Sequence, residues 1–327
     1  MQYTLRLFSS VLLFAFLIGC ESSVEAPQPT AEDMPEQART ATAFLPANSR
    51  MMAMVDLQQM RTHGPAALQE AFAEISDPSM NGSGQLQEFL AESGMDLSKD
   101  VERVYLTQAG TEGGRPHMVI TGTFNRERIG QALQARTGRD FQTVTLSGVS
   151  AFTLQRDDGS DVSLAVVRDD MLLIAPSQHD LNAMLERSAA SDGPSSSDGM
   201  LIQAASQGQS AWYVLRGLDG APSSDAPDNM ARLGRALQDM AGSFTFTDGG
   251  ALDGTLVLVP KPSASSADVA DVVRGLVAAA KQSSDMNADA RQALDRMEVR
   301  TTSDGTVSVS AQLPASLVNR LADTDGE

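Results

Sequence analysis

The sequence contains few cysteine, lysine and aromatic residues. Among its 327 residues there is one cysteine, Cys20, so the chain can form no intramolecular disulfide. It has three Lys against 21 Arg, with one Trp, three Tyr and three His. About 300 residues are enough to bury one large or two medium hydrophobic cores. Stability must therefore come from core packing, without a disulfide framework.

Positive charge is scarce as well. The 24 Lys and Arg residues face 42 Asp and Glu residues, which leaves a formal net charge of -18. Arg6 is the single charged side chain before Cys20, so a chain that begins at Cys20 carries -18 - 1 = -19. A surface this negative repels nucleic acid and anionic headgroups, and we expect no nucleic-acid partner.

Recognisable catalytic and ligand-binding motifs are missing. The sequence has no Gly-x-Ser-x-Gly, His-Glu-x-x-His, Gly-Lys-Ser/Thr or Ser-x-x-Lys pattern. His63, His117 and His179 lie far apart in the sequence, which favours isolated histidines over a metal or catalytic cluster. The sequence therefore predicts no cofactor, no metal and no assigned catalytic residue.

A hydrophobic run long enough to cross a membrane is also missing. The run from Val11 to Ile18 follows Arg6 and has eight apolar residues, whereas a spanning helix needs about 20. Its length and position are typical of a secretory signal peptide. The stretch Leu17-Ile18-Gly19-Cys20 resembles the lipobox of bacterial lipoproteins.

This resemblance implies that residues 1–19 are a signal peptide and that Cys20 becomes the acylated mature N-terminus. The protein would then be held at a membrane by the covalent lipid on Cys20, facing the periplasm or the cell exterior. Glu21 does not decide between the two membranes, and we favour the outer over the inner one. Residues 20–43 are rich in Pro, Glu, Ala and Thr, which predicts an acylated N-terminus followed by a flexible tether.

The rest of the chain predicts an α+β fold of antiparallel sheets with helices packed on one face. Asp-Gly turns at Asp158, Asp248 and Asp304 favour hairpins, and Ser177 is a predicted helix cap. The Ser, Asp, Gly and Pro content of residues 188–199 suggests a boundary. We expect two similar halves, 44–190 and 210–327, joined by a linker at 191–209. Their closing segments align with Leu181 opposite Leu317 and Leu185 opposite Leu321.

Apolar periodicity predicts individual elements along both halves. Helices are expected around residues 68–75, 86–90, 129–133, 181–185, 230–240, 269–280, 290–297 and 317–321. Strands are expected around residues 50–57, 101–108, 117–124, 141–147, 149–155, 162–167, 171–176, 210–218, 242–260 and 299–314, the last two ranges each being a hairpin.

The body resembles uncharacterised lipoproteins of Gram-negative bacteria that open their mature domain with a Phe-Leu-Pro and Val-Asp-Leu pattern. Here the pattern consists of Phe44-Leu45-Pro46, Val55-Asp56-Leu57 and Met60. The resemblance implies a repeated α+β unit and transfers no activity.

Three local patterns have both a functional and a structural interpretation. Residues 157–161 (DDGSD) could present carboxylates to Ca²⁺, but they lack EF-hand spacing and favour a hairpin turn. The cluster Met51, Met52, Met54 and Met60 could bind Cu(I), although core packing is the better interpretation. Trp212 and Tyr213 point to opposite faces of a strand, so one of them could be an exposed contact for a partner or glycan.

Two functions from different classes remain. The first is a lipid-anchored, non-enzymatic envelope module that binds a protein, a lipid or a glycan. The alternative is a carboxylate-dependent envelope hydrolase with two carboxyl groups about 5 to 10 Å apart in a cleft. The missing nucleophile motifs favour the binding module.

Overall fold

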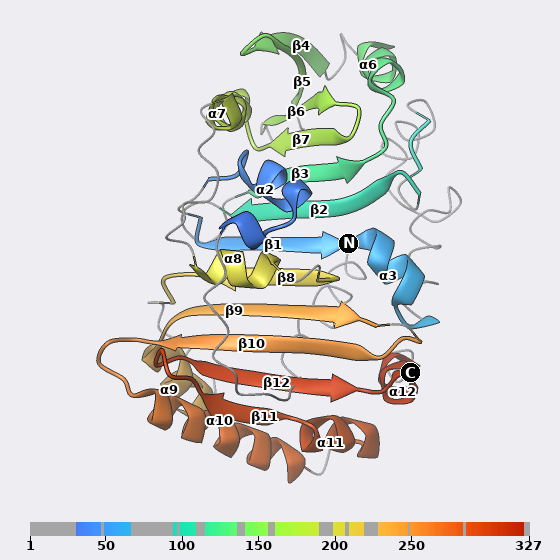
Figure 1. Cartoon of the computed structure of the whole chain (residues 1–327). Helices are drawn as coiled ribbons and strands as arrows, with labels where there is room; N and C mark the ends of the chain where they lie inside the picture. The colour runs from blue at the N-terminus through green and yellow to red at the C-terminus, as the bar shows by residue number, and fades with distance from the viewer. Residues whose placement is uncertain are drawn as a thin grey trace. The chain divides into compact units, whose positions relative to one another are not determined.

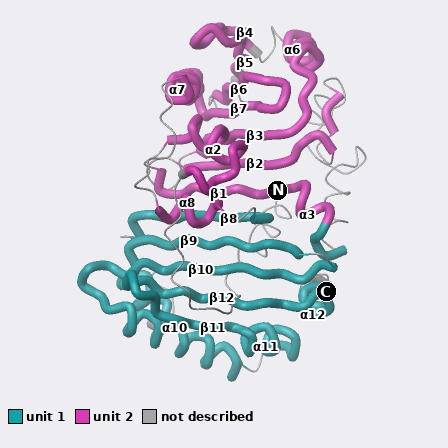
Figure 2. The backbone as a smooth tube through the Cα atoms, viewed as in Figure 1, with its two compact units in different colours: residues 1–28, 63–67, 207–327 teal, residues 29–62, 68–206 magenta. Residues whose placement is uncertain are grey.

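A computed structural model describes residues 31–46, 49–66, 94–96, 99–108, 115–135, 141–155, 161–189, 199–206, 209–218, 228–247, 249–283 and 286–323. The chain forms two compact units (Figure 2). Unit 2 includes residues 29–62 and 68–206, and unit 1 includes residues 63–67 and 207–327.

Unit 2 is built around seven antiparallel strands in the order β1-β2-β3-β7-β6-β5-β4 (Figure 1). Its helices are η1 (Ala31–Asp33), α2 (Glu36–Thr42), α3 (Leu57–His63), α6 (Arg126–Ala135), α7 (Gln178–Ala189) and α8 (Gly199–Ala205). Its strands are β1 (Met51–Asp56), β2 (Val101–Gln108), β3 (His117–Gly122), β4 (Phe141–Leu146), β5 (Val149–Gln155), β6 (Asp161–Arg168) and β7 (Met171–Ala175).

Unit 1 has five antiparallel strands in the order β8-β9-β10-β12-β11. These are β8 (Ala211–Leu215), β9 (Leu237–Phe246), β10 (Leu252–Pro260), β11 (Glu298–Thr301) and β12 (Val307–Leu313). Its helices are α9 (Asp228–Ala236), α10 (Ser266–Lys281), α11 (Ala288–Asp295) and α12 (Ala315–Asp323). The predicted α+β class with antiparallel sheets is confirmed.

The two units share one strand order. In unit 2 the order β1-β2-β3-β7-β6 corresponds to β8-β9-β10-β12-β11 in unit 1, and a helix follows the first, third and last strand of each series along the chain. Unit 2 has the additional hairpin β4-β5 at the end of its sheet. The aligned leucines Leu181 and Leu317 also have corresponding places in the fold. Each is completely buried and lies on the helix that follows the last strand of its unit along the chain. A repeated unit stays a prediction, which this shared order supports.

Each unit has its own apolar core. In unit 1, Val269 and Val273 of α10 pack on one face of the sheet against Leu256, Leu258 and their neighbours. The opposite face of β10 carries Asp253, Thr255, Val257 and Val259, which are all half-buried, so the more deeply buried face of this strand is the one that α10 covers. In unit 2, the successive residues Met171, Leu172 and Leu173 are all buried, which means that β7 is covered on both faces.

The predicted tether needs correction in its second half. Residues 36–42 form α2, and Met34, Ala38, Ala41 and Leu45 are buried at helical spacing. The prediction relied on the absence of large apolar residues, but alanine loses no side-chain entropy on burial and lets a helix lie close to a sheet. Here α2 lies against β3. Residues 20–30 lie outside the described part of the chain.

Two other predictions differ from the structure. The helix predicted at 230–240 ends at Ala236, and Leu237 begins β9, because pairing of β9 with β10 along its whole length outweighs the local periodicity. The predicted linker 191–209 contains α8, in which Leu201 and Ile202 are buried. The helices predicted at 68–75 and 86–90 and the turns at Asp158 and Asp248 lie outside the described residues.

Candidate functional site

A cleft of about 540 Å³ lies in unit 2 where β3 ends and α6 begins. Phe124 and Ile129 contribute an apolar floor, and both side chains are almost completely buried. Charged side chains also line the cleft: Asp100, Arg126, Glu127 and Asp169. The volume is in the range of small-ligand sites, which combine an apolar lining with a few polar groups.

Backbone hydrogen bonds from the end of β3 hold two other segments at the cleft. The N–H of Thr123 donates to the carbonyl oxygen of Asp100 at 2.7 Å. The next residue, Phe124, donates its N–H to the carbonyl oxygen of Asp169 in the β6–β7 turn, also at 2.7 Å. These bonds place the carboxylates of Asp100 and Asp169 at one cleft, although the residues are far apart in sequence.

Gly122 makes this arrangement possible. A Cβ atom at residue 122 would lie 1.9 Å from the carbonyl oxygen of Asp100, so no other residue fits without moving the backbone. At the start of α6, Oδ1 of Asn125 accepts a hydrogen bond from the N–H of Arg128 at 2.9 Å. This bond caps α6 and fixes the first turn of the helix beside the cleft.

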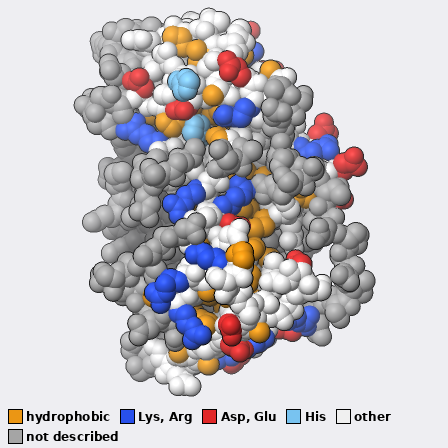
Figure 3. Space-filling model, turned by 90° about the vertical axis from the view of Figure 1, so that its left-hand side faces the viewer, with side chains coloured by type: hydrophobic (Ala, Val, Ile, Leu, Met, Phe, Trp, Pro, Cys, Tyr) orange, Lys and Arg blue, Asp and Glu red, His pale blue; other side chains and the backbone are white. Residues whose placement is uncertain are grey.

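A second polar cluster joins β3 to α7. The Nε2 atom of His117 lies 3.7 Å from Oδ1 of Asp180, and the His117 side chain is 8% exposed. Burial lowers the pKa of His117, Asp180 opposes this shift, and Arg187 adds to it. Figure 3 shows histidine side chains with acidic and basic side chains next to them on the face it displays. The cluster was not predicted, because His117 and Asp180 are 63 residues apart in the sequence.

This cluster does not have the connectivity of a serine hydrolase. The hydroxyl of Ser177 donates to Oδ2 of Asp180 at 2.7 Å and accepts from the N–H of Asp180 at 3.1 Å. A catalytic serine donates to histidine, and the carboxylate lies on the far side of that histidine. Here the carboxylate lies between the hydroxyl and the imidazole, so Ser177 is the predicted helix cap.

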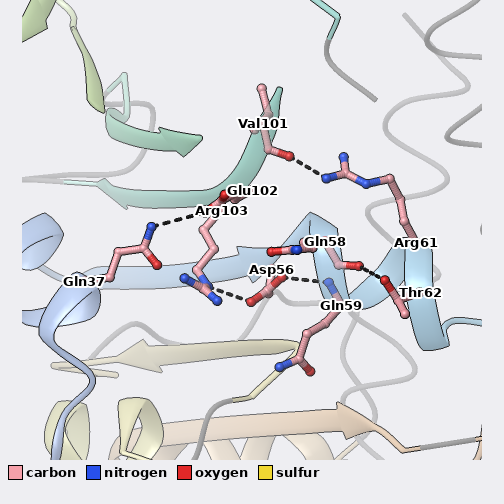
Figure 4. Close-up of polar contacts among 9 residues, drawn as sticks. All are labelled: Gln37, Asp56, Gln58, Gln59, Arg61, Thr62, Val101, Glu102 and Arg103. Carbon is pink, nitrogen blue, oxygen red and sulfur yellow. Dashed lines mark hydrogen bonds and ion pairs between the residues drawn. The ribbon is translucent and has the colours of Figure 1, made fainter. Parts of the chain in front are cut away.

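A buried ion pair lies at the end of β1 (Figure 4). Nε of Arg103 is 2.6 Å from Oδ2 of Asp56, whose side chain is 1% exposed. Oδ1 of Asp56 accepts a hydrogen bond from the N–H of Gln59 at 2.8 Å, which caps α3. Asp56 is the acidic residue of the Val-Asp-Leu pattern, and the pattern Asp-x-x-Gln before an apolar position could have identified the cap from the sequence.

Arg61 extends this cluster through its Nη2 atom, which donates to the carbonyl oxygen of Val101 at 2.7 Å (Figure 4). Burial raises the pKa of Tyr105 to about 12, while Arg103 lowers it and Asp56 raises it. The side chains of Asp56, Arg103 and Arg61 each bond to one another or to the backbone. We therefore interpret the cluster as structural support for β1 and β2.

The predicted aromatic contact surface needs correction. Trp212 is 2% exposed, and Tyr213 packs against the core of unit 1 with its ring over Gly242. Burial raises the pKa of Tyr213 to about 12. Both faces of a strand lose exposure when other elements pack over each of them, and the alternation of side chains along the strand does not reveal this.

The other predicted sites either lie outside the described residues or are part of the core. Cys20 and residues 157–160 lie outside the described residues. Met52, Met54 and Met60 are buried packing residues, in agreement with the core interpretation. Across the residues that the structure describes, no group of three or more His, Cys, Asp or Glu residues could hold a metal ion. In the same part of the chain, no helix has the length and apolar character needed to cross a membrane.

Comparison with known proteins identifies a similar fold and no sequence relative. No family model matches the chain, and no curated protein matches it. Crystal form III of TP0453 has a TM-score of 0.51 at 8% identity and covers 86% of this chain and 96% of TP0453. Crystal forms IV and I of TP0453 give TM-scores of 0.48 and 0.47 at 9% and 7% identity, over 88% and 87% of this chain and 96% of TP0453. The likeness to form III concerns the fold alone.

Proposed function

We propose that this chain is a lipid-anchored protein of the bacterial envelope that binds an amphiphilic ligand in the unit 2 cleft and catalyses no reaction. The observation that carries the proposal is the combination of the apolar floor at Phe124 and Ile129 with charges of both signs at the same cleft. An apolar group of a ligand would contact half-buried Met95 and the small surface that Phe124 and Ile129 leave open, and a polar head would meet the charged side chains.

The charges favour a head that itself carries both signs. Arg126 begins α6, a helix of 10 residues, where a cationic side chain and the helix N-terminus both attract an anion. Asp100 and Asp169 contribute carboxylates that would attract an ammonium group on the same ligand. A zwitterionic head such as phosphocholine or phosphoethanolamine has this chemistry, and lipids at a membrane carry such heads.

The cleft supports binding better than carboxylate-dependent hydrolysis. A carboxyl group that acts as a general acid is held in an apolar surrounding that keeps it protonated. Among the described residues of the cleft, Glu127 and Asp169 are exposed, and Oδ2 of Asp100 accepts a hydrogen bond from the N–H of Asp96 at 2.7 Å. These carboxylates are therefore placed to attract a charged group rather than to transfer a proton.

The ligand proposal is tested with dodecylphosphocholine below its micelle concentration, titrated into the full-length Cys20→Ala protein in a calorimeter. We expect saturable binding that weakens about tenfold in Arg126→Gln and in Asp169→Asn, since each substitution removes one charge-assisted contact of about 1.4 kcal/mol. Asp268→Asn is the matched control, because Asp268 is an exposed acid in unit 1. Equal affinity in all variants, or no binding, would contradict the proposal.

The anchor is tested separately by cell fractionation. The lipobox predicts that the wild-type protein is recovered with membranes and that Cys20→Ala is not, because two or three acyl chains bind a bilayer persistently whereas a bare polypeptide does not. Ser22→Ala is the control, since it changes a neighbouring residue and leaves the thiol intact. Membrane recovery of Cys20→Ala equal to that of wild type would refute the lipid anchor and leave the cleft proposal standing.

A further inference from the structure

The strand β4 ends the unit 2 sheet and has few of the features that usually protect an edge strand. It is the last strand in the strand order, and it pairs with β5 through six consecutive residues without a register shift. Natural edge strands are normally protected by short length, charged residues, proline, a bulge or a covering segment. The sequence of β4, FQTVTL, has no charged residue and no proline. Gln142, Thr143 and Thr145 are exposed.

The strand β11, which ends the unit 1 sheet, has the protection that β4 lacks. It is four residues long and contains the ion pair between Arg300 and Glu298. In addition, Nη2 of Arg274 in α10 donates to the carbonyl oxygen of Val299 at 3.0 Å and so occupies a backbone acceptor of the edge. Among the residues that the structure describes, no turn or loop hydrogen bond reaches the backbone of β4, although α6 and α7 both contact this strand.

The hairpin that presents β4 is held in position. Its turn residues Ser147 and Gly148 both have positive φ values, 47° and 81°, as a two-residue type I′ hairpin requires. The hydroxyl of Ser147 donates to Oδ1 of Asn182 in α7 at 3.0 Å, and Nδ2 of Asn182 donates to Oε1 of Glu186 at 2.6 Å. The edge is therefore an ordered strand whose outer backbone groups can accept a further strand.

We propose that the β4 edge pairs with the β4 edge of a second copy of this chain, in antiparallel register centred on Val144. In this register Val144 lies opposite its own copy, Thr143 lies opposite Thr145, and Gln142 lies opposite Leu146. Paired residues then share a face of the joined sheet, as two-fold symmetry about an axis perpendicular to the sheet requires. Threonine pairs across strands are favourable.

Charge is the reason that the second strand comes from the same protein. Each copy carries a formal net charge of -18, yet residues 141–155, which form the whole β4-β5 hairpin, contain no charged residue. Two acidic copies can approach at this hairpin with the least repulsion, and no like charges meet across the symmetric pair. An edge that selects a basic foreign strand would present carboxylates, and this hairpin has none. The inference is independent of the proposed ligand.

The experiment measures the oligomeric state of the full-length protein by sedimentation velocity over a wide range of protein concentration, in one buffer and detergent for all variants. We expect a concentration-dependent dimer whose dissociation constant rises about tenfold or more in Thr143→Lys/Thr145→Lys, because four like charges then meet across the pair. Thr301→Lys/Gln312→Lys is the control with the same change in net charge at exposed residues of unit 1. Since it lowers the net negative charge without touching β4, its dimer should be as strong or stronger.

A second measurement checks the register in case the lysine variant fails to fold. In Cys20→Ala/Val144→Cys the two thiols of a dimer meet at the symmetry axis, so a short thiol cross-linker should couple two chains. The same cross-linker should leave the chains of Cys20→Ala/Thr301→Cys uncoupled on a denaturing gel, because Thr301 lies on β11, away from the proposed contact. A monomer at every concentration, or a dimer equally strong in the lysine variant and insensitive to the cross-linker, would overturn the proposal. Capture of a different envelope protein that is lost in the lysine variant would also overturn it and assign the edge to that partner.

Discussion

Nε of Arg103 on β2 lies 2.6 Å from Oδ2 of Asp56 on β1, and these two residues are direct partners in the register of the two strands. Removing one member of a buried ion pair leaves the other charge uncompensated. Asp56 also caps α3, so a single carboxylate connects the first two strands of unit 2 to the helix between them.

Asp56→Ala is therefore expected to destabilise the protein by about 3 kcal/mol, at the low end of values for buried pairs because Arg103 is partly exposed. Asp56→Asn should cost about half as much, since asparagine caps a helix as well as aspartate does. Urea unfolding at neutral pH measures both free energies. The interpretation fails if Asp56→Ala changes the free energy of unfolding by less than about 0.5 kcal/mol, as an exposed pair would.

Gly122→Ala is expected to damage the cleft. The new Cβ would lie 1.9 Å from the carbonyl oxygen of Asp100, so the backbone must separate at the bond that Thr123 donates to that oxygen. We expect a loss of about 2 to 3 kcal/mol in urea unfolding, together with weaker dodecylphosphocholine binding. Gly130→Ala is the matched control in α6, where a Cβ has no atom within 4 Å. It should stabilise the protein by about 0.5 to 1 kcal/mol, and the same sign for both variants would contradict the argument.

The free energy of unfolding should depend on pH through His117. Burial lowers its pKa in the folded protein below the ordinary value of 6.5. Between the lowered pKa of the folded protein and the ordinary value of 6.5, the unfolded chain binds more protons than the folded one. The contribution of neutral His117 to the free energy of unfolding is therefore lost as pH falls below 6.5. The urea midpoint of wild type should therefore fall more than that of His117→Gln between pH 7.5 and 5.5. Parallel midpoints for the two proteins would rule out His117 as a source of the dependence.

The β4-β5 turn offers a test of backbone strain. Ser147 has a φ of 47°, a conformation that asparagine adopts more readily than serine. Ser147→Asn creates the Asn-Gly sequence favoured in type I′ turns and should stabilise the protein by about 0.5 kcal/mol, because the gain in backbone preference exceeds the loss of the exposed hydroxyl bond to Asn182. Gly148→Ala should have the opposite effect, because residue 148 has a φ of 81°. Thermal unfolding measures both changes, and a stabilising Gly148→Ala would exclude the assigned turn.

Local sequence patterns were sufficient for most described elements. The strands β4 to β7 were predicted because apolar alternation is separated there by short polar turns. Helix α10 was predicted because valine and leucine recur at helical spacing. The hydroxyl of Ser177 was predicted to cap α7, and it does so at 3.1 Å from the N–H of Asp180. These features depend on residues within one turn or one hairpin.

Local sequence patterns could not predict the candidate site. Asp100 and Asp169 meet at the cleft only because both bond to the backbone that follows β3. The helix predicted across Leu237 failed for a related reason, since a register of nine residue pairs with β10 makes that residue part of a strand. Long-range pairing supplies hydrogen bonds that a periodicity argument does not count.

The sequence by itself determined the acidic charge, the absence of a disulfide and of four common catalytic and ligand-binding motifs, and the α+β composition, because each follows from residue types or from spacing along a short segment. The tertiary structure alone decided that Trp212 is buried, that α2 packs against β3, and that the uncharged strand β4 ends its sheet. Burial and edge position are properties of which strands become neighbours. That choice is made by contacts between residues far apart in the chain, and no segment contains the information alone.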